Sequence, residues 1–153
     1  MPGQQASSCH GINHLPSQKE GKGAVFLLDS EMIGETQPMV NIFMNKMKTE
    51  GFRNMIDRDF ARYTDNCIDD FLHGNVKSLF GNVKQLSKVV LKHFKPMIPD
   101  SFHQLWAKGI ESNDYYLKLC GSGGGGYILG FTEDFEKAKN LLQDYKLELV
   151  YRF

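Results

Sequence analysis

Residues 115–131 read YYLKLCGSGGGGYILGF, and this stretch decides the fold. The segments on both sides of the glycines are apolar and aromatic, which is typical of β-strands. Five of the six residues at 121–126 are glycine. A flexible linker between domains is one alternative, but a linker has no reason to be bracketed directly by two strand-forming segments. The pattern therefore predicts an antiparallel hairpin of residues 115–120 and 127–131.

Two further strands are expected outside the hairpin. Residues 24–29, AVFLLD, form a compact apolar run that predicts a strand buried on both faces. Residues 146–153, KLELVYRF, alternate in polarity and predict an edge or half-buried strand. Between the hairpin and this last strand, Thr132 is the expected N-cap of a helix with an apolar stripe over residues 135–145.

Four helices are expected between the first strand and the hairpin, because apolar residues recur there at helical spacing. The expected helices cover residues 36–51, 52–71, 76–94 and 99–109. The first is capped by Thr36 or Gln37, the second ends at Gly74, and the fourth lies between Pro99 and Gly109. The second and third are expected to pack antiparallel.

The order of these elements reduces to βαββαβ when the helices after the first strand count as one crossover. We therefore expect an α+β fold, with a ferredoxin-like antiparallel sheet and a multi-helix insertion after the first strand. The domain is expected to span residues 24–153. Residues 1–23 show no sustained period, so we expect a loosely ordered leader that contributes at most one short strand.

Composition limits the classes of function. The 153 residues carry 18 Lys or Arg and 18 Asp or Glu, so no net charge attracts nucleic acid or anionic lipid. The longest apolar run is far shorter than the roughly 20 residues that cross a bilayer. Three widely spaced cysteines and the absence of a secretion signal favour a reducing compartment. We expect a cytoplasmic protein without nucleic-acid or membrane partners.

The glycine loop is the candidate binding site. Consecutive backbone amides with positive φ can form a concavity that cradles phosphate, and Lys118 can add a cation. The run is not a Walker A loop, because no Gly-Lys-Ser/Thr follows it, and it is not a dinucleotide fingerprint, because a strand follows it. A wide hairpin turn without a ligand remains an alternative, although such turns need fewer glycines.

The segment KLCGSGGGGYILGF, followed by a capped helix, resembles the third motif of the GHMP kinases. These small-molecule kinases are named for galactokinase, homoserine kinase, mevalonate kinase and phosphomevalonate kinase. The wider stretches FLLDSEMIGETQPMV and HFKPMIPDSFHQLWAKGIESNDYYLKLCGSGGGG are most similar to bacterial mevalonate kinases, and the resemblance covers about residues 24–145. Cys120 stands where Thr or Ser is common in the motif, and Tyr127 stands where Cys is common.

The resemblance implies the C-terminal domain of a kinase that uses ATP with Mg²⁺ to phosphorylate a hydroxyl of mevalonate or a similar molecule in isoprenoid biosynthesis. The implied ATP and phosphate loop consists of Lys118, Cys120, Gly121, Ser122, Gly123, Gly124, Gly125 and Gly126. The family's serine-rich glycine motif and its catalytic Asp and Lys have no counterpart in this sequence. We therefore expect no catalytic residue here, no activity from the chain alone, and either an N-terminal kinase half or self-association through an exposed apolar interface.

The remaining candidate residues favour structural roles. His93 and His103 lie across a helix break without a cysteine or carboxylate cluster, so no metal site is expected. Cys67 falls on an apolar helix stripe, and Cys9 lies in the leader without a rigid frame. The alternative function is a non-catalytic ferredoxin-like module that binds a small anion or a partner protein. An in-frame kinase half encoded upstream of Met1 would decide between the two.

Overall fold

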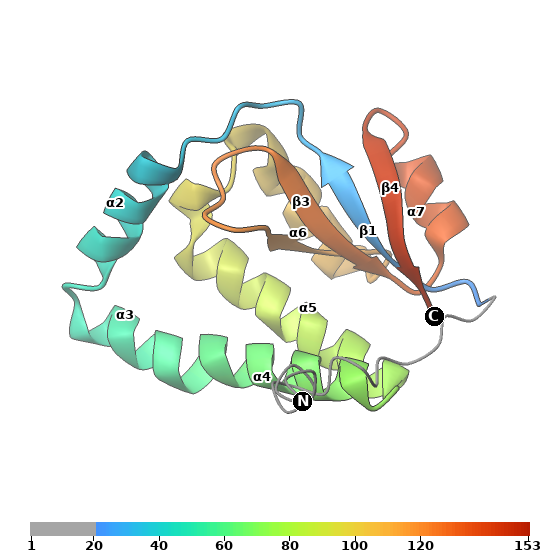
Figure 1. The fold of residues 1–153 in the computed structure, drawn as a ribbon, viewed down its shortest axis with the longest axis horizontal. Helices are drawn as coiled ribbons and strands as arrows, with labels where there is room; N and C mark the ends of the chain where they lie inside the picture. The colour runs from blue at the N-terminus through green and yellow to red at the C-terminus, as the bar shows by residue number, and fades with distance from the viewer. Residues whose placement is uncertain (1–20) are drawn as a thin grey trace, which may run out of the picture.

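The computed structural model describes residues 21–153, which form a four-stranded antiparallel sheet with helices packed around it (Figure 1). The strands are β1 Ala24–Asp29, β2 Tyr116–Leu119, β3 Tyr127–Thr132 and β4 Lys146–Arg152, in the order β2-β3-β1-β4. This is the ferredoxin-like order, so the predicted α+β fold is confirmed. Residues 1–20 of the predicted leader lie outside the described residues.

The strands β2 and β3 form the predicted hairpin around the glycine loop, with Leu119 opposite Ile128. Strand β1 lies between β3 and β4 and is therefore mostly buried. Gly130 in β3 lies opposite Phe26 in β1, and the ring of Phe26 fills the space that a Cβ at Gly130 would need. The glycine lets the aromatic ring cross the neighbouring strand.

Helices occupy the segments before and after the hairpin. They are α2 Thr36–Lys46, α3 Glu50–Met55, the π-helical turn η2 Ile56–Phe60, α4 Ala61–Leu72, α5 Val76–His93, the 3-10 turns η3 Lys95–Met97 and η4 Asp100–Phe102, α6 His103–Ser112 and α7 Phe135–Leu141. Together α3, η2 and α4 form the second predicted helix, and α5 runs back along α4 as expected (Figure 1). Gly74 has a φ of 71° and ends this helix as predicted.

The first predicted helix is shorter than expected. Helix α2 ends at Lys46, and Gly51 lies inside the first turn of α3 instead of closing α2. The chain leaves the helical path at Met47, whose carbonyl oxygen accepts a 2.8 Å hydrogen bond from the Arg53 guanidinium. The Arg53 side chain thus supplies a hydrogen-bond donor to a carbonyl oxygen at the end of α2, and this stabilises the turn between α2 and α3.

Two predicted helix caps are wrong by one or two residues. Glu35, with extended backbone, precedes α2, so Thr36 and Gln37 already belong to the helix. Asp134 caps α7, because its carboxylate accepts a hydrogen bond from the amide three residues later. Thr132 ends β3 instead of capping the helix.

Helix α6 continues past its predicted end at Gly109. It runs to Ser112, and Asn113 adopts the left-handed conformation with a φ of 61°. Gly109 serves a different purpose, because the ring and carbonyl oxygen of Tyr115 occupy the position of a Cβ there. The glycine permits the close approach of α6 to the start of β2.

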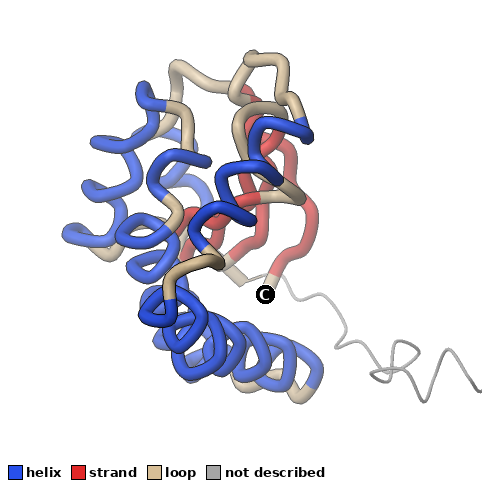
Figure 2. Tube along the Cα trace, turned by 90° about the vertical axis from the view of Figure 1, so that its left-hand side faces the viewer, coloured by secondary structure: helices blue, strands red, loops and turns tan. Residues whose placement is uncertain are grey.

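The helices form two groups around the sheet (Figure 2). Helices α6 and α7 lie behind the sheet in Figure 1, and Phe135 of α7 packs on Phe26 with ring centroids 5.9 Å apart. The α4–α5 hairpin extends below the other face. Trp106 of α6 is fully buried and donates a 3.1 Å hydrogen bond to the carbonyl oxygen of Ser87 in α5, which joins the two groups.

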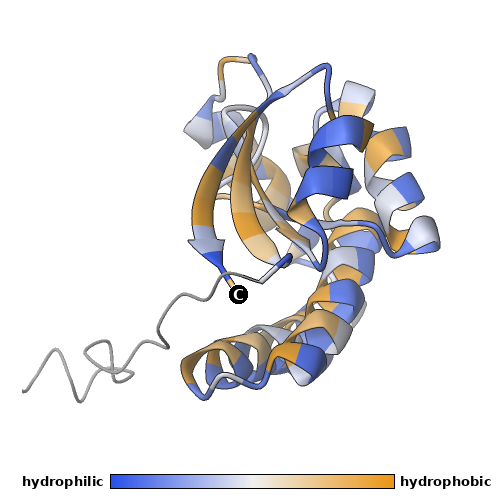
Figure 3. Ribbon diagram, turned by 90° about the vertical axis from the view of Figure 1, so that its right-hand side faces the viewer, coloured by the Kyte–Doolittle hydropathy of each residue, from blue (hydrophilic) through white to orange (hydrophobic). Residues whose placement is uncertain are grey.

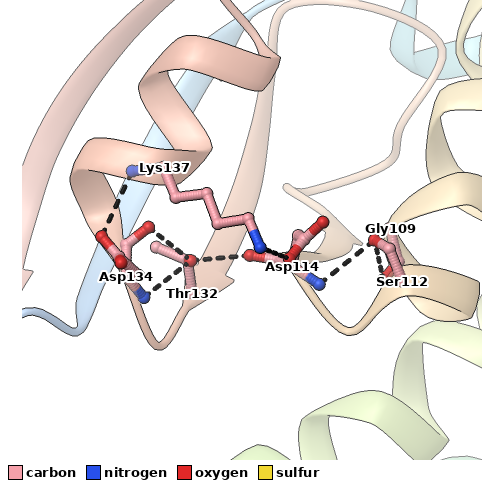
Figure 4. A network of polar contacts seen from close by, with 6 residues as sticks. All are labelled: Gly109, Ser112, Asp114, Thr132, Asp134 and Lys137. Atoms are coloured by element: carbon pink, nitrogen blue, oxygen red, sulfur yellow. Dashed lines mark hydrogen bonds and ion pairs between the residues drawn. The ribbon is translucent and has the colours of Figure 1, made fainter.

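Polar contacts fix the end of the β2–β3 hairpin that lies away from the glycine loop (Figure 4). The buried Thr132 hydroxyl donates a 2.7 Å hydrogen bond to the Asp114 carbonyl oxygen and accepts one from the Asp134 amide. The Lys137 ammonium lies 2.9 Å from the Asp114 carboxylate and holds the pKa of that carboxyl below its usual range. These contacts hold the segments before β2 and after β3 together, so the hairpin presents its loop at the opposite end.

Candidate functional site

The glycine loop connects the end of β2 to the start of β3 and adopts a backbone that favours glycine. Gly121, Gly123, Gly124 and Gly126 have φ values between 59° and 82°. Side chains with a Cβ rarely adopt this left-handed conformation. The glycine composition therefore follows from the course of the chain in the loop.

Close contacts with the rest of the chain also require glycine. A Cβ at Gly124 would lie 2.8 Å from the Cγ and Sδ atoms of Met39, and one at Gly123 would lie 2.7 Å from the carbonyl oxygen of Met97. A Cβ at Gly125 would lie 2.8 Å from the backbone nitrogen of Gly34. The loop is thus pressed against α2, η3 and the segment after β1.

Half of the loop amides are used to hold the loop in place. The amide of Gly124 donates a 2.7 Å hydrogen bond to the Met97 carbonyl oxygen, and that of Gly126 donates one of 2.8 Å to Met32. The amide of Gly123 bonds the Cys120 carbonyl oxygen at 3.3 Å. These three amides are directed to carbonyl oxygens of the chain, so the predicted cradle of consecutive amides is smaller than expected.

Three amides remain available to a ligand. Within residues 21–153, the amides of Gly121, Ser122 and Gly125 make no backbone or side-chain hydrogen bond. Gly121 and Ser122 are adjacent, and Gly121 is exposed. Two adjacent free amides are the part of the loop that can bind an anion.

A cavity of about 270 Å³ lies beside these two residues. Its described lining is formed by Met39, Val40, Phe43, Phe60, Val90, Phe94, Met97, Lys118, Leu119, Gly121 and Ser122. Lys118 is the charged member of this lining, and its ammonium donates a 3.3 Å hydrogen bond to the Leu119 carbonyl oxygen. The structure therefore brings Lys118, Gly121 and Ser122 to the lining of one cavity, where an ammonium and two free amides are the donors for an anionic group.

Cys120 is the remaining residue of the predicted loop set, and it is half-buried beside the site. Burial raises the pKa of its thiol, and the nearby Lys118 charge offsets this only in part. The thiol is therefore protonated near neutral pH. A protonated thiol is a poor nucleophile, so the geometry gives Cys120 no role in covalent catalysis.

The other candidate residues have structural surroundings. The His103 ring nitrogen lies 2.9 Å from the Ile98 carbonyl oxygen and 3.0 Å from that of Lys95. Burial raises the pKa of the Cys67 thiol to about 12. Among the described residues, no three His, Cys, Asp or Glu side chains gather closely enough to hold a metal ion. None of the helices in residues 21–153 combines the length and apolar character needed to cross a membrane.

Sequence reasoning missed the helical side of this site. Phe43 lines the loop cavity from α2, Phe60 from η2, and Phe94 from the position between α5 and η3. Phe60 ends the π-helical turn η2 and packs on Phe94 with ring centroids 5.1 Å apart. Their helical spacing marked them as apolar, but that pattern is the same for a core position and for the wall of a cavity.

A solved structure supports the fold of this site. The chain is similar to the Streptococcus pneumoniae phosphomevalonate kinase solved in complex with phosphomevalonate and AMPPNP, with a TM-score of 0.66 and 15% sequence identity. The similarity covers 88% of this chain and 40% of the kinase chain. No model of a protein family and no curated protein sequence matches the chain. Phosphomevalonate kinase is a GHMP kinase, so the expected GHMP-like fold is confirmed, without a preference for mevalonate kinase within that group.

Proposed function

We propose that this chain forms the C-terminal, loop-bearing part of a small-molecule kinase of the GHMP type. The observation that carries the proposal is the pair of free amides at Gly121 and Ser122, which lie beside Lys118 at an apolar cavity. Two amide donors and one cation suit a phosphate group. The similar kinase was solved with phosphomevalonate and AMPPNP, which supports a phosphorylated small molecule and a nucleotide as ligands in an assembled enzyme.

The residues at the loop fit phosphate better than Mg²⁺. The described lining of the cavity contains Lys118 but no carboxylate, whereas Mg²⁺ prefers oxygen ligands and usually takes one or two carboxylates. We infer that Mg²⁺ arrives with ATP and that its protein ligands come from the other half of the kinase. The part played by this chain is to position phosphate oxygens and to neutralise part of their charge.

The small number of phosphate-binding groups at the loop explains why we propose no activity for the chain alone. Phosphoryl transfer depends on positioning the two reactants and on neutralising the charge of the transferred group with metal ions and cations. The loop supplies two amides and one ammonium, which is a small part of that requirement. In our proposal an N-terminal half supplies the second phosphate loop, the catalytic Asp and a further Lys.

We propose a mevalonate-like small molecule of isoprenoid biosynthesis as the acceptor and the cytoplasm as the location. The transfer would place phosphate on a hydroxyl of this molecule. The ligand of the similar kinase makes an already phosphorylated molecule the nearest alternative acceptor. The two candidate acceptors differ in the group that receives the phosphate. It is an alcohol oxygen in the first and a phosphate oxygen in the second.

A non-catalytic module that binds an anion or a partner protein is the second candidate function. The observation that favours it is the packing of the loop, because Gly123, Gly124 and Gly125 meet Met97, Met39 and Gly34 so closely that the protein itself requires glycine. In that case close packing alone, without ATP binding, would explain why these loop positions are glycine. Both functions share the free amides and differ in whether a kinase half joins the chain.

Amide NMR of the isolated chain tests the proposal. On addition of inorganic phosphate or AMPPNP, we expect shifts at Gly121 and Ser122, with dissociation constants of about 1 mM or weaker because one site of this kind supplies little affinity. Gly124 and Gly126 should move little, because their amides are already bonded. A response of equal size at all six residues of the loop, or none at Gly121 and Ser122, would contradict the proposal. Phosphate transfer to mevalonate by the chain alone would contradict the need for a second half.

A further inference from the structure

The cavity beside the glycine loop is apolar except for the groups that we assign to phosphate binding. Its described lining contains Lys118, Gly121 and Ser122, and every other lining residue is apolar. None of the described lining residues carries a carboxylate, a carboxamide or an imidazole. The cavity therefore offers donors for one anionic group, while the rest of a ligand would meet apolar side chains.

The Lys118 ammonium lies at the loop end of this cavity. It donates a 3.3 Å hydrogen bond to the carbonyl oxygen of Leu119, the last residue of β2. Gly121 follows Leu119 by two residues, so the ammonium and the Gly121 amide are no more than about 9 Å apart. The donors for an anion thus share one end of the cavity.

The apolar wall begins directly beside these donors. The carbonyl oxygen of Met97 accepts the hydrogen bond of the Gly124 amide, and Met39 lies against the same glycine. Both methionines also line the cavity. A phosphate held by the loop would therefore have its organic group within reach of these two side chains.

Aromatic rings form a further part of the wall. Phe43 and Phe94 stack with an interplanar angle of 6° and ring centroids 6.3 Å apart, and the centroid of Phe60 lies 5.1 Å from that of Phe94. Phe60 enters from the π-helical turn η2, a type of irregularity that often occurs at functional sites. An apolar group in the cavity would add contacts to an existing aromatic cluster.

We propose that the phosphate bound at the glycine loop belongs to a monoester of a compact apolar group, aryl or branched alkyl, which fills this cavity. The inference rests on the proposed function, because it names the ligand class of the same phosphate site. In the assembled enzyme, the ester would be the phosphorylated product or, for an already phosphorylated acceptor, the substrate. A cavity of about 150 Å³ already accommodates benzene. The 270 Å³ here therefore leaves room for one ring.

The same lining disfavours esters of sugars and other polyols. Their hydroxyl groups are hydrogen-bonded to water in solution, and the apolar walls would leave most of them without a partner. An aryl or alkyl group loses no hydrogen bond and gains free energy when its surface is removed from water. Selectivity among phosphate esters would therefore come from the side chains around the loop.

The test compares phenyl phosphate, methyl phosphate and glycerol 3-phosphate on the full chain by NMR, at about pH 8, where phosphate monoesters are mostly dianions. The amides of Gly121 and Ser122 should shift with each ester, because all three carry the phosphate group. Phenyl phosphate should bind at least about tenfold more tightly than methyl phosphate, since burying the apolar surface of two methylene groups already gives this factor. Glycerol 3-phosphate should bind no more tightly than methyl phosphate. The methyl signals of Met39, Val40 and Met97 should shift with phenyl phosphate only.

A larger groove of about 510 Å³, between the sheet and the α4–α5 hairpin, is the competing apolar site. Apolar positions are visible on the strands and the helices on either side of it (Figure 3). The groove exposes no polar surface, so Lys118 contributes only its apolar stem there and phosphate finds no donor. Phenyl phosphate should leave the methyl signals of Ile68 and Leu129, which line this groove, unchanged. Shifts there in place of Val40 and Met39 would overturn the proposal.

Two variants with matched exposure locate the apolar group. Val40 lines the loop cavity and is 39% exposed, whereas Val76, at the start of α5, is 37% exposed and lies outside that lining. In Val40→Asn, the preference for phenyl over methyl phosphate should fall at least about threefold, because a polar group replaces part of the apolar wall. In Val76→Asn, the preference should persist.

The possible outcomes separate this inference from the proposed function. Equal affinity for the three esters, with shifts at Gly121 and Ser122, would overturn the apolar group and leave the phosphate site intact. An unchanged preference in Val40→Asn would place the apolar group elsewhere and would also overturn the inference. The absence of an amide shift with any ester would contradict the proposed function and this inference together.

Discussion

The amide of Gly124 donates a 2.7 Å hydrogen bond to the carbonyl oxygen of Met97, which ties the glycine loop to the turn after α5. Met39 of α2 covers the same glycine from another side. The loop is therefore held by segments far from it in sequence before any ligand binds. A loop held in this way presents its remaining free amides in a fixed arrangement, which lowers the entropic cost of binding an anion.

The first prediction concerns Gly124 itself. Gly124→Val should lower the free energy of unfolding by about 1–3 kcal/mol or more, because a branched side chain at a φ of 82° is strained and would meet Met39. The variant would therefore do more than keep phosphate away. Urea unfolding measures the loss. Gly126→Ala is the matched control, since its φ is 70° and no atom lies within 4 Å of the added Cβ, so only about 1–2 kcal/mol should be lost.

The second prediction separates anion binding from backbone strain. Gly121→Ala should weaken the NMR response to inorganic phosphate, because a methyl group is added next to the free amides of Gly121 and Ser122. Gly74→Ala should show the same loss of stability, since both glycines have left-handed φ and open surroundings, but should leave phosphate binding unchanged. Equal weakening in both variants would count against the loop as the anion site.

The third prediction tests close packing of α6. Gly109→Ala should destabilise the chain by about 1–3 kcal/mol, because the new methyl group would overlap Tyr115. Gly81→Ala, in the interior of α5 with no atom near the added Cβ, should instead stabilise it by about 0.5–1 kcal/mol through a better helix propensity. Thermal unfolding of the two variants measures both changes in stability. Changes of the same sign would mean that Gly109 is not a packing position.

The fourth prediction concerns the Thr132 hydroxyl at the end of the hairpin. Thr132→Val should cost about 1–3 kcal/mol, because the Asp114 carbonyl oxygen and the Asp134 amide would lose their buried partner. Thr132→Ser keeps the hydroxyl and should cost about 1 kcal/mol for the lost methyl group. If urea unfolding gives both variants the same stability, the hydroxyl does not hold the hairpin.

The fifth prediction is a loss of stability at alkaline pH. Burial raises the pKa of the Cys67 thiol from 9.0 to about 12 and that of Tyr115 from 10.0 to about 12. The folded chain therefore keeps protons that the unfolded chain releases in this range. The free energy of unfolding should be at its full value below about pH 9 and should fall as the pH rises toward 12.

Urea unfolding between pH 8 and 11 measures this slope. Cys67→Val removes one of the groups with a raised pKa and should make the decline shallower, and Tyr115→Phe should do the same over the upper part of the range. The Tyr115 variant also loses a 2.6 Å hydrogen bond to the Leu105 carbonyl oxygen, so its stability at pH 8 should be lower. A slope identical to that of the unaltered chain in both variants would contradict the assignment.

The sequence determined the sheet and the helices through local patterns. Strand-forming segments on both sides of residues 121–126 predict the hairpin, and helical spacing predicts α4 and α5, because these periods reflect which side of each element is buried. Helix ends were predicted less well. Gly109 looked like a helix terminator, yet its missing Cβ makes room for Tyr115, a contact that no local pattern records.

Tertiary structure alone decided which parts of the loop can bind a ligand. The sequence marks five glycines as equivalent, but the carbonyl oxygens of Met32 and Met97 reach the amides of Gly126 and Gly124 and leave those of Gly121 and Ser122 free. It also decided that Lys118 lines two cavities, since β2 meets α2 and α5 at one of them, and the sheet meets α4 and α5 at the other. A backbone amide can donate only to an acceptor within reach, and the neighbours of a loop in space are fixed only when the distant segments of the chain have packed.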